Sequence, residues 1–296
     1  MPPHTAPPTV PALAATLREP GPGLVVLDPV RATLLTELDV LFTRLASRTS
    51  AAPVVGPPLL PAAGLARLDY FRNFPHLGVV AARFQDEAFD ALAAGDQAED
   101  QPVRPTGYML PSATCYGLLL SLAAQDIDTE LRVTAVGRCF RNEDHYEGLR
   151  RLWGFHMREV LYLGSADGAR DHLALSKGFI EDLAERLGVP LSYRPANDPF
   201  YDKSGSRAKL MALDPVKYEF TAEDGTAIAS VNRHRNFFGE RLGITADGRT
   251  AHSSCTAFGV ERWVHAMVLA HGSPESALER VRQVGDGMAG GNDCTG

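Results

Sequence analysis

The sequence predicts one α+β domain in which an antiparallel β-sheet is flanked by helices. Three observations carry this prediction: an amphipathic helix pattern near the N-terminus, a long region of short strand-like runs, and helix patterns with clear start and stop signals after it. The chain has 296 residues, of which 45% are hydrophobic and 22% are charged, a balance typical of a globular protein. Disorder along the whole chain is therefore excluded.

The first predicted helix begins at Pro29, because an acidic residue followed by proline is a common helix start and Asp28 precedes it. Apolar residues then recur at helical spacing, at Leu34, Leu35, Leu38, Leu41, Phe42 and Leu45. We expect this helix to end near Ser47. Proline-rich residues 53–61 follow, and the runs of aromatic and β-branched residues from there to about residue 164 predict antiparallel strands.

The second half of the chain carries further helices and strands. A helix is predicted from Ser165 to Leu187, and the glycine and the proline that follow it closely mark its end. Strand-like runs come next, at Lys217–Thr221 and Ala227–Asn232. Two more helices are predicted, over Val260–Ala270 and Glu275–Val284.

Both ends of the chain are predicted to lie outside the folded domain. Residues 1–24 are rich in proline and small residues, which bury little surface, so we expect a flexible arm. The glycine-rich end that starts at Gly285 is expected to fray. This leaves one folded domain over residues 25–286 and a flexible tail over 287–296.

Charge and hydrophobicity exclude several classes of protein. The 29 basic and 36 acidic residues give a net charge of −7, so a general basic surface for nucleic acid is absent. The longest apolar run, Tyr116–Ala124, is less than half of the roughly 20 residues that cross a membrane, and the first 22 residues lack the features of a signal peptide. We therefore expect a cytoplasmic protein with no membrane partner, whose four cysteines are thiols or metal ligands.

A predicted hairpin formed by residues 137–143 and 152–163 carries the first candidate functional residues. Two arginines, two glutamates and one aromatic ring share a face: Arg141, Glu143, Arg151, Phe155 and Glu159. So many charges pack poorly in a core, whereas a charged planar ligand such as a nucleotide fits them. The alternative is that they form the solvated outer face of the sheet.

The order of these residues resembles a known family. The string Phe-Arg-Asn-Glu at 140–143, followed by Gly-Leu-Arg-Arg at 148–151, resembles motif 2 of class II aminoacyl-tRNA synthetases, most closely of the seryl enzymes. Residues Thr256–Arg262, which open a predicted helix, resemble motif 3. Between them, Ile228–Asn232 resembles the strand that lines the amino-acid and ribose sites of the seryl enzymes.

The resemblance runs from about Pro53 to Gly272 and implies the class II synthetase catalytic fold, an antiparallel sheet flanked by helices. The residues around Pro57 and Pro58 correspond to motif 1, which forms the dimer interface in this family. A homodimer is therefore expected.

In this family, motifs 2 and 3 bind ATP, and the resemblance implies a role for each matching residue. Arg141 would stabilise the charge that develops on the α-phosphate. Glu143 would accept a hydrogen bond from the adenine amino group, and Phe155 would stack on the ring. Arg151 and Arg262 would hold the β- and γ-phosphates.

The strand between these motifs is expected to complete the ATP site. Its residues are Ala229, Ser230, Val231 and Asn232, which would line the ribose or the α-phosphate. Lys217 would be a further ATP ligand, unless it is a solvated lysine at a strand edge. The seryl enzymes have an Arg-Glu pair, with the glutamate as a magnesium ligand, where this chain has Thr226 and Ala227, so the magnesium ligands stay open.

Cys115, Glu159 and Cys255 occupy positions that the resemblance brings to the amino-acid pocket. Atypical archaeal-type seryl synthetases and their small relatives, the amino acid:carrier protein ligases, hold a zinc ion with Cys, Glu and Cys, and its free position takes the amino group of the substrate. The resemblance therefore implies zinc here, the alternative being two buried structural cysteines. Cys139 is expected in the core, and three histidines are expected to be structural: His156, His234 and His252.

Fewer than about 60 residues precede the motif 1 region, whereas the seryl enzymes carry a large N-terminal module that binds tRNA. We therefore expect an amino acid:carrier protein ligase with no tRNA partner. Such enzymes activate a small amino acid, glycine or alanine, as its adenylate and transfer it to the phosphopantetheine thiol of a carrier protein. ATP with magnesium would be a substrate, and Asn232 would join the zinc ligands at the amino acid. The alternatives are a minimal synthetase that charges tRNA, an inactive regulatory paralogue, and a structural zinc domain.

Overall fold

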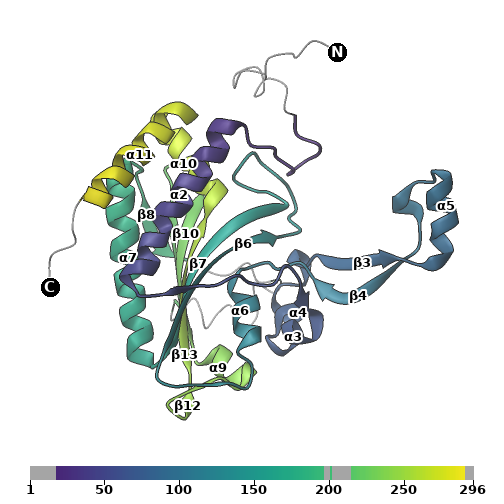
Figure 1. Ribbon diagram of the computed structural model, residues 1–296, viewed down its shortest axis with the longest axis horizontal. Helices are drawn as coiled ribbons and strands as arrows, with labels where there is room; N and C mark the ends of the chain where they lie inside the picture. The colour runs from purple at the N-terminus through teal and green to yellow at the C-terminus, as the bar shows by residue number, and fades with distance from the viewer. Residues whose placement is uncertain (1–17, 197–200, 202–214, 291–296) are drawn as a thin grey trace, which may run out of the picture.

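A large sheet forms the centre of the molecule (Figure 1). In a computed structural model of the chain, residues 18–196, 201 and 215–290 are described, and within them this sheet has seven strands. In spatial order they are β1 (Ala52–Pro53), β6 (Leu131–Phe140), β7 (Gly154–Gly164), β13 (His252–Gly259), β10 (Ala227–Arg235), β9 (Lys217–Thr221) and β8 (Ser192–Pro195). All neighbours pair antiparallel except β1 and β6, which are parallel. The predicted α+β class is confirmed.

Four long helices cover one face of the sheet and enclose the largest apolar core with it (Figure 1). They are α2 (Pro29–Arg48), α7 (Ala166–Leu187), α10 (Val260–His271) and α11 (Pro274–Gly290). As the sequence predicts, Asp28 caps α2 by accepting hydrogen bonds from two backbone N–H groups, and Ser165 caps α7. Phe42 of α2 stacks on Phe258 of β13 with ring centroids 4.4 Å apart, which fastens this helix to the sheet.

The C-terminal boundary differs from the sequence prediction. A frayed tail was expected from Gly285, but α11 continues to Gly290. Arg44 of α2 donates hydrogen bonds to the carbonyl oxygens of Gly285 and Met288, at 3.2 and 3.3 Å, and so fastens the last turns to the body. The rest of the predicted tail, 291–296, lies outside the described residues.

The N-terminal boundary also differs from the sequence prediction, because part of the predicted arm contacts the domain. Residues 1–17 of the predicted arm lie outside the described part of the chain. The remainder, 18–24, contacts the domain, since the backbone N–H of Trp153 donates to the carbonyl of Gly23 at 3.1 Å. A side chain at Gly23 would collide with the ring of Tyr146, so this segment packs closely against the body.

The other face of the sheet carries shorter elements. They are α3 (Ala62–Arg67), α4 (Tyr70–Asn73), η1 (Pro75–Leu77), α6 (Cys115–Ser121), α9 (Phe237–Leu242) and a small sheet of β5 (Asp126–Ile127), β11 (Thr245–Ala246) and β12 (Arg249–Thr250). Apolar residues of α6 and α9 pack with this face in a second core. The loops between these elements leave room for a pocket.

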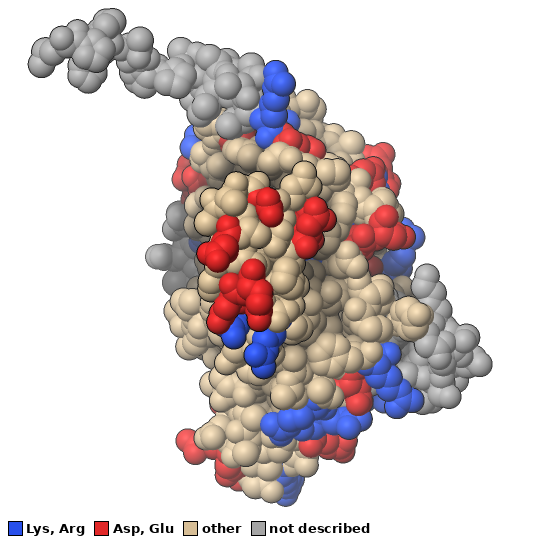
Figure 2. All heavy atoms as spheres, turned by 90° about the vertical axis from the view of Figure 1, so that its right-hand side faces the viewer, with Lys and Arg blue, Asp and Glu red and all other residues tan. Residues whose placement is uncertain are grey.

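An arm projects from the body at this side, which the sequence did not predict (Figure 1). It comprises β2 (Leu60–Pro61), β3 (Val80–Phe84), η2 (Asp86–Ala88), α5 (Phe89–Ala94), η3 (Ala98–Asp100) and β4 (Val103–Met109), with β4 in the middle of a three-stranded sheet. None of the residues of α5 is buried. Six acidic and two basic residues lie between Val80 and Met109, and acidic side chains gather near the middle of the face seen in Figure 2.

Strand β6 is shorter than the predicted strand, because it ends at Phe140. Arg141 and Glu143 therefore lie in the loop that follows, and the expectation that strand alternation puts them on one face is wrong. The backbone of Arg141 still bonds to the carbonyl of Trp153 at 3.1 Å, which keeps this loop close to the start of β7. No helix among the described residues is long and apolar enough to cross a membrane.

Candidate functional site

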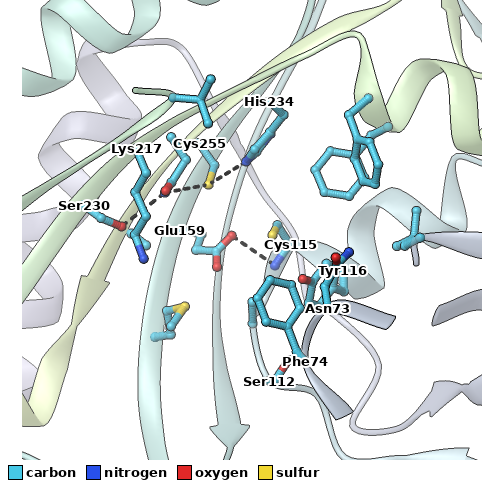
Figure 3. Close-up of a pocket in the computed structure, with 18 of the residues that line it drawn as sticks. Asn73, Phe74, Ser112, Cys115, Tyr116, Glu159, Lys217, Ser230, His234 and Cys255 are labelled. Carbon is cyan, nitrogen blue, oxygen red and sulfur yellow. Dashed lines mark hydrogen bonds between the residues drawn. The ribbon is translucent and has the colours of Figure 1, made fainter. Parts of the chain in front are cut away.

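A pocket of about 290 Å³ lies over the sheet, between the strands and the shorter elements α4, α6 and α9 (Figure 3). Strand alternation and register decide which side chains face it. Lys217 of β9 is the cross-strand partner of Asn232 in β10, and Asn232 is the partner of Cys255 in β13. Partners in adjacent antiparallel strands share a face, so all three side chains line the pocket.

Cys115, Glu159 and Cys255 meet at the bottom of this pocket. Cys115 is the first residue of α6, while Glu159 and Cys255 come from the neighbouring strands β7 and β13. Their sulfur and carboxylate atoms all lie within 4.8 Å of one another, and all three residues are buried. The backbone N–H of Cys115 donates to Glu159 Oε2 at 3.0 Å, which fixes the carboxylate. Residues 44 and 96 positions apart along the chain thus form one cluster.

The pKa values of the three residues in this cluster are strongly shifted. Burial raises the pKa of Glu159 to about 8, with a further contribution from the charge of Cys255. A hydrogen bond between the two cysteines raises the pKa of Cys115 and lowers the pKa of Cys255. Cys255 is therefore the favoured thiolate of the pair. Two sulfurs and one carboxylate oxygen within reach of a common centre are donors that zinc prefers, so these residues fit a zinc ion with one position left open.

Asn232 connects the cluster to the rest of the pocket. Its side-chain N–H groups donate to Cys255 Sγ at 3.5 Å and to Ser230 Oγ at 3.1 Å. His234 lies on the other side of Cys255, with its Nε2 atom 3.5 Å from the sulfur and its Nδ1 atom 3.0 Å from Ser253 Oγ. The Cys255 sulfur thus has polar side chains on two sides.

Arginines occupy the opposite end of the site. Arg141 donates two hydrogen bonds to the carbonyl oxygen of Ser112, at 3.1 and 3.2 Å, and its guanidinium lies 5.1 Å from the centre of the Phe155 ring. Glu143 forms an ion pair with Arg151 at 2.8 Å. The loop after β6 therefore presents a guanidinium and a carboxylate, and the start of β7 adds an aromatic ring beside the guanidinium.

Arg262, at the start of α10, is partly buried and held by the backbone. Its guanidinium donates to the carbonyl oxygens of Arg150 at 2.8 Å and Ala227 at 3.1 Å. Burial lowers its pKa to about 10, so it stays positively charged at neutral pH. A small second cavity beside the pocket is lined by Arg262, Glu143, Phe155 and Arg150.

The structure brings most of the sequence-predicted residues to this site but not all. Arg141, Lys217, Ser230 and Asn232 line the pocket together with the Cys/Glu/Cys cluster, and Lys217 forms an ion pair with Glu219 at 3.0 Å. The side chains of Ala229 and Val231 lie in the large core instead. Alternation along β10 explains this, because Ala229 and Val231 alternate with the pocket-facing Ser230 and Asn232 and therefore point to the other face. Cys139 is fully buried, as predicted.

Several residues that line the pocket were not predicted from the sequence. His234 was expected to be structural, yet it lines the pocket and touches a member of the cluster. Asn73 and Phe74 reach the pocket from α4 and the residue after it, and Tyr116 from α6 (Figure 3). No motif marks Asn73 or Phe74, and only the neighbouring Cys115 could have signalled Tyr116.

The protein-family model of the class II tRNA synthetase core domain (G, H, P, S and T) matches residues 106–271. Amino acid–[acyl-carrier-protein] ligase 1 of Bradyrhizobium diazoefficiens is 31% identical over 235 residues, which cover 75% of this chain and 72% of the relative. Ligase 2 of the same organism is 33% identical over 241 residues, covering 73% and 69%. The chain belongs to this ligase family.

More distant relatives of the ligase include the type-2 serine–tRNA ligase of Methanopyrus kandleri, 24% identical over 307 residues, which cover 91% of this chain and 58% of the relative. The solved M. kandleri seryl-tRNA synthetase, in complex with a tRNA, superposes with a TM-score of 0.76 at 23% identity, over 90% of this chain and 57% of that one. The Pyrococcus horikoshii seryl-tRNA synthetase superposes with a TM-score of 0.66 at 16% identity, over 89% and 58%. These likenesses confirm the class II synthetase fold.

Proposed function

We propose that this ligase uses ATP to activate glycine or alanine as the aminoacyl-adenylate and transfers the aminoacyl group to the phosphopantetheine thiol of an acyl carrier protein. The observation that supports this most strongly is the Cys115–Glu159–Cys255 cluster at one end of a pocket whose other end carries Arg141. One end suits an amine held by a metal, and the other suits a phosphate. The names of the two Bradyrhizobium diazoefficiens ligases agree with this reaction.

Cys115, Glu159 and Cys255 would hold a zinc ion and leave its fourth position to the α-amino group of the substrate. When bound, zinc is a Lewis acid that favours the unprotonated amine. Phe74 and Tyr116 stand beside Cys115, so a bulky substrate side chain would meet aromatic rings (Figure 3). A small amino acid fits this arrangement best.

In the first step, a carboxylate oxygen of the amino acid attacks the α-phosphorus of ATP, and the bond to pyrophosphate breaks. The step needs no general base, because the attacking carboxylate is ionised at neutral pH. Arg141 would stabilise the charge that develops at the α-phosphate, and Arg262 would hold the outer phosphates. Arg151 lines neither cavity but is paired with Glu143, which does, and would join Arg262 at these phosphates. Glu143 and Phe155 would position the adenine.

In the second step, the sulfur of the phosphopantetheine thiol attacks the carbonyl carbon of the adenylate. A thioester forms, AMP leaves with the bonding electrons, and the thiol proton passes to solvent. The pocket is partly open, so a long flexible arm from a carrier protein could reach it. We further propose that the ligase is a homodimer.

The test incubates the protein with ATP, magnesium and labelled glycine, alanine or serine, and then supplies a phosphopantetheinylated carrier protein or total tRNA. We expect label on the carrier protein and none on tRNA. Label on tRNA would instead establish a minimal synthetase. If amino-acid-dependent exchange of pyrophosphate into ATP is absent, the protein is a regulatory paralogue.

Cysteine variants test the metal cluster directly. Cys115→Ser and Cys255→Ser should each lose bound zinc and reduce amino-acid activation by about 100-fold or more, because each removes one of three ligands. Cys139→Ala is the matched control, since this buried thiol lies outside the cluster. Zinc is measured by elemental analysis and activation by pyrophosphate exchange. Full activity in a zinc-free protein would contradict the proposal.

A further inference from the structure

The guanidinium of Arg262, which lines the second cavity, is oriented by two carbonyl oxygens that lie far apart in the chain. Its Nε–H group donates to the carbonyl of Arg150 at 2.8 Å, and an Nη1–H group donates to the carbonyl of Ala227 at 3.1 Å. Arg150 lies in the loop between β6 and β7, whereas Ala227 is the first residue of β10. The direction of the guanidinium therefore depends on what holds these two segments together.

A contact between side chains joins the two segments. Thr226 directly precedes Ala227, and its hydroxyl accepts a hydrogen bond from Arg150 Nε at 2.8 Å. Thr226 is buried, with 5% of its surface exposed, so water competes little for this bond. Arg150 also donates to Glu147 Oε1 at 2.8 Å, within its own loop. Together with the two bonds of Arg262, the Thr226 contact closes a ring of three hydrogen bonds.

Asp224 fastens the turn between β9 and β10 that carries Thr226. Its Oδ1 atom accepts a hydrogen bond from the backbone N–H of Thr226 at 3.0 Å. Its Oδ2 atom lies 3.4 Å from Arg150 Nε and 2.8 Å from His265 Nε2. His265 is on α10, one turn after Arg262. The turn is therefore connected both to the loop and to the helix that carries Arg262.

Thr226 and Asp224 line neither of the two cavities, and the proposed function gives them no role. A buried hydroxyl costs free energy unless it is hydrogen-bonded, and the Thr226 hydroxyl has the Arg150 guanidinium as its partner. In an active site, a displacement of about 1 Å can cost on the order of 100-fold in rate. A connected set of contacts behind Arg262 would prevent such a displacement.

We propose that Thr226 and Asp224 are positioning residues for Arg262. Through Arg150 they hold the two carbonyls that direct the remaining N–H groups of Arg262 toward the outer phosphates of ATP. This inference rests on the proposed use of ATP. The alternative is that these contacts only stabilise the turn between β9 and β10.

The first measurement is the affinity for a non-hydrolysable ATP analogue with magnesium, obtained by calorimetry. Thr226→Val removes the hydroxyl but keeps nearly the same shape, and it should weaken binding by about fivefold, as should Asp224→Asn. Thr226→Ser keeps the hydroxyl and should stay within about twofold of the wild type. Thr221→Val is the matched control, because the buried hydroxyl of Thr221 has no hydrogen-bond partner among the described residues. It should leave the affinity unchanged.

The second measurement asks whether Thr226 acts through Arg262. When Arg262→Lys is already present, Thr226→Val should weaken binding of the analogue by less than about twofold, because changes within one hydrogen-bonded network are not additive. Pyrophosphate exchange should show the same dependence. Thr226→Val should raise the KM for ATP by about fivefold and leave the KM for the amino acid unchanged.

Equal affinity of the wild type and Thr226→Val for the analogue would overturn the proposal, even if the variant unfolds at a lower temperature. An equal loss of affinity with and without Arg262→Lys would also overturn it, because Thr226 would then act independently of Arg262. If the wild type exchanges no pyrophosphate but the variants show the expected affinities, the proposed function fails and this inference stands.

Discussion

At the scale of single residues, backbone carbonyls fix the arginine at the start of α10. Arg262 uses two guanidinium N–H groups on the carbonyls of Arg150 and Ala227, and the remaining N–H groups are available to a ligand. A lysine keeps the charge but cannot make this fork. The geometry of the Arg262 guanidinium, and not only its charge, is therefore expected to matter for ATP binding.

Arg262→Lys should raise the KM for ATP by about tenfold, since one charge-assisted contact is worth roughly 1.5–3 kcal/mol. The content of the proposed zinc ion should not change, because Arg262 is not part of the Cys115–Glu159–Cys255 cluster. Steady-state pyrophosphate exchange measures the KM, and Arg282→Lys on the exposed side of α11 serves as the control. An unchanged KM would reject the role of Arg262.

A buried histidine should make stability depend on pH. His172 of α7 packs against Tyr162 and lies 2.9 Å from Ser254 Oγ, and burial lowers its pKa from 6.5 to about 4. As the pH falls below 6.5, His172 becomes protonated in the unfolded chain but stays neutral in the folded chain. The free energy of unfolding therefore falls as the pH falls. Between pH 7 and pH 5 this amounts to about 2 kcal/mol.

His172→Asn should remove that part of the pH dependence, as measured by urea unfolding of the zinc-loaded protein at both values. His145→Asn is the control, because His145 is exposed. If the wild type and His172→Asn lose the same free energy of unfolding between pH 7 and pH 5, His172 is not the cause.

The residues of the site were predictable to different degrees. Cys115, Glu159 and Cys255 are distant in sequence, and only the resemblance to a family brought them together before the structure did. Ala229 and Val231 were wrongly predicted to line the ATP site. Only alternate side chains of their strand reach the pocket, and these two lie in the core. Asn73 was missed, because the packing of a short helix against the sheet leaves no periodic or motif signal in the sequence.

At the scale of elements, the long helices were predictable and the arm was not. α2 and α7 have caps and apolar stripes, which are local features. The strands of the arm have mostly exposed side chains, so no alternation of buried and exposed residues marks them. The last turns of α11 depend on Arg44, a contact 241 residues away in sequence.

The arm should be dispensable for adenylation, because the pocket is built on the seven-stranded sheet and on α4, α6 and α9. Replacing residues 82–105 with Asn-Gly joins Ala81 to Thr106, whose hydroxyl already bonds the Ala81 carbonyl at 2.8 Å. Zinc content and the pyrophosphate-exchange rate should stay within about twofold of the wild type, as for other surface changes. A larger loss of exchange would show that the arm supports the site.

At the scale of the whole molecule, the sheet is closed by long helices on one face and carries the site on the other, while its β1 edge has an apolar border. Val55, just after β1, is 95% exposed, and Val54, Leu59 and Val136 near this edge are each more than one third exposed. Exposed apolar residues gathered at a sheet edge are typical of an interface. The motif 1 region, which the sequence analysis connected with dimerisation, contains most of them.

Val55→Asp should convert the proposed homodimer into a monomer, because it places a charge in the centre of this apolar edge. Light scattering after size-exclusion chromatography should show the wild type at about twice the 31.9 kDa of one chain and the variant at the chain mass. Val40→Asp, at a residue of α2 that is 51% exposed, is the matched control and should remain dimeric. Because Cys115, Glu159 and Cys255 come from one chain, the Val55→Asp monomer should retain the proposed zinc ion. A wild type that is monomeric at micromolar concentration, or a Val55→Asp variant that stays dimeric, would reject this edge as the interface.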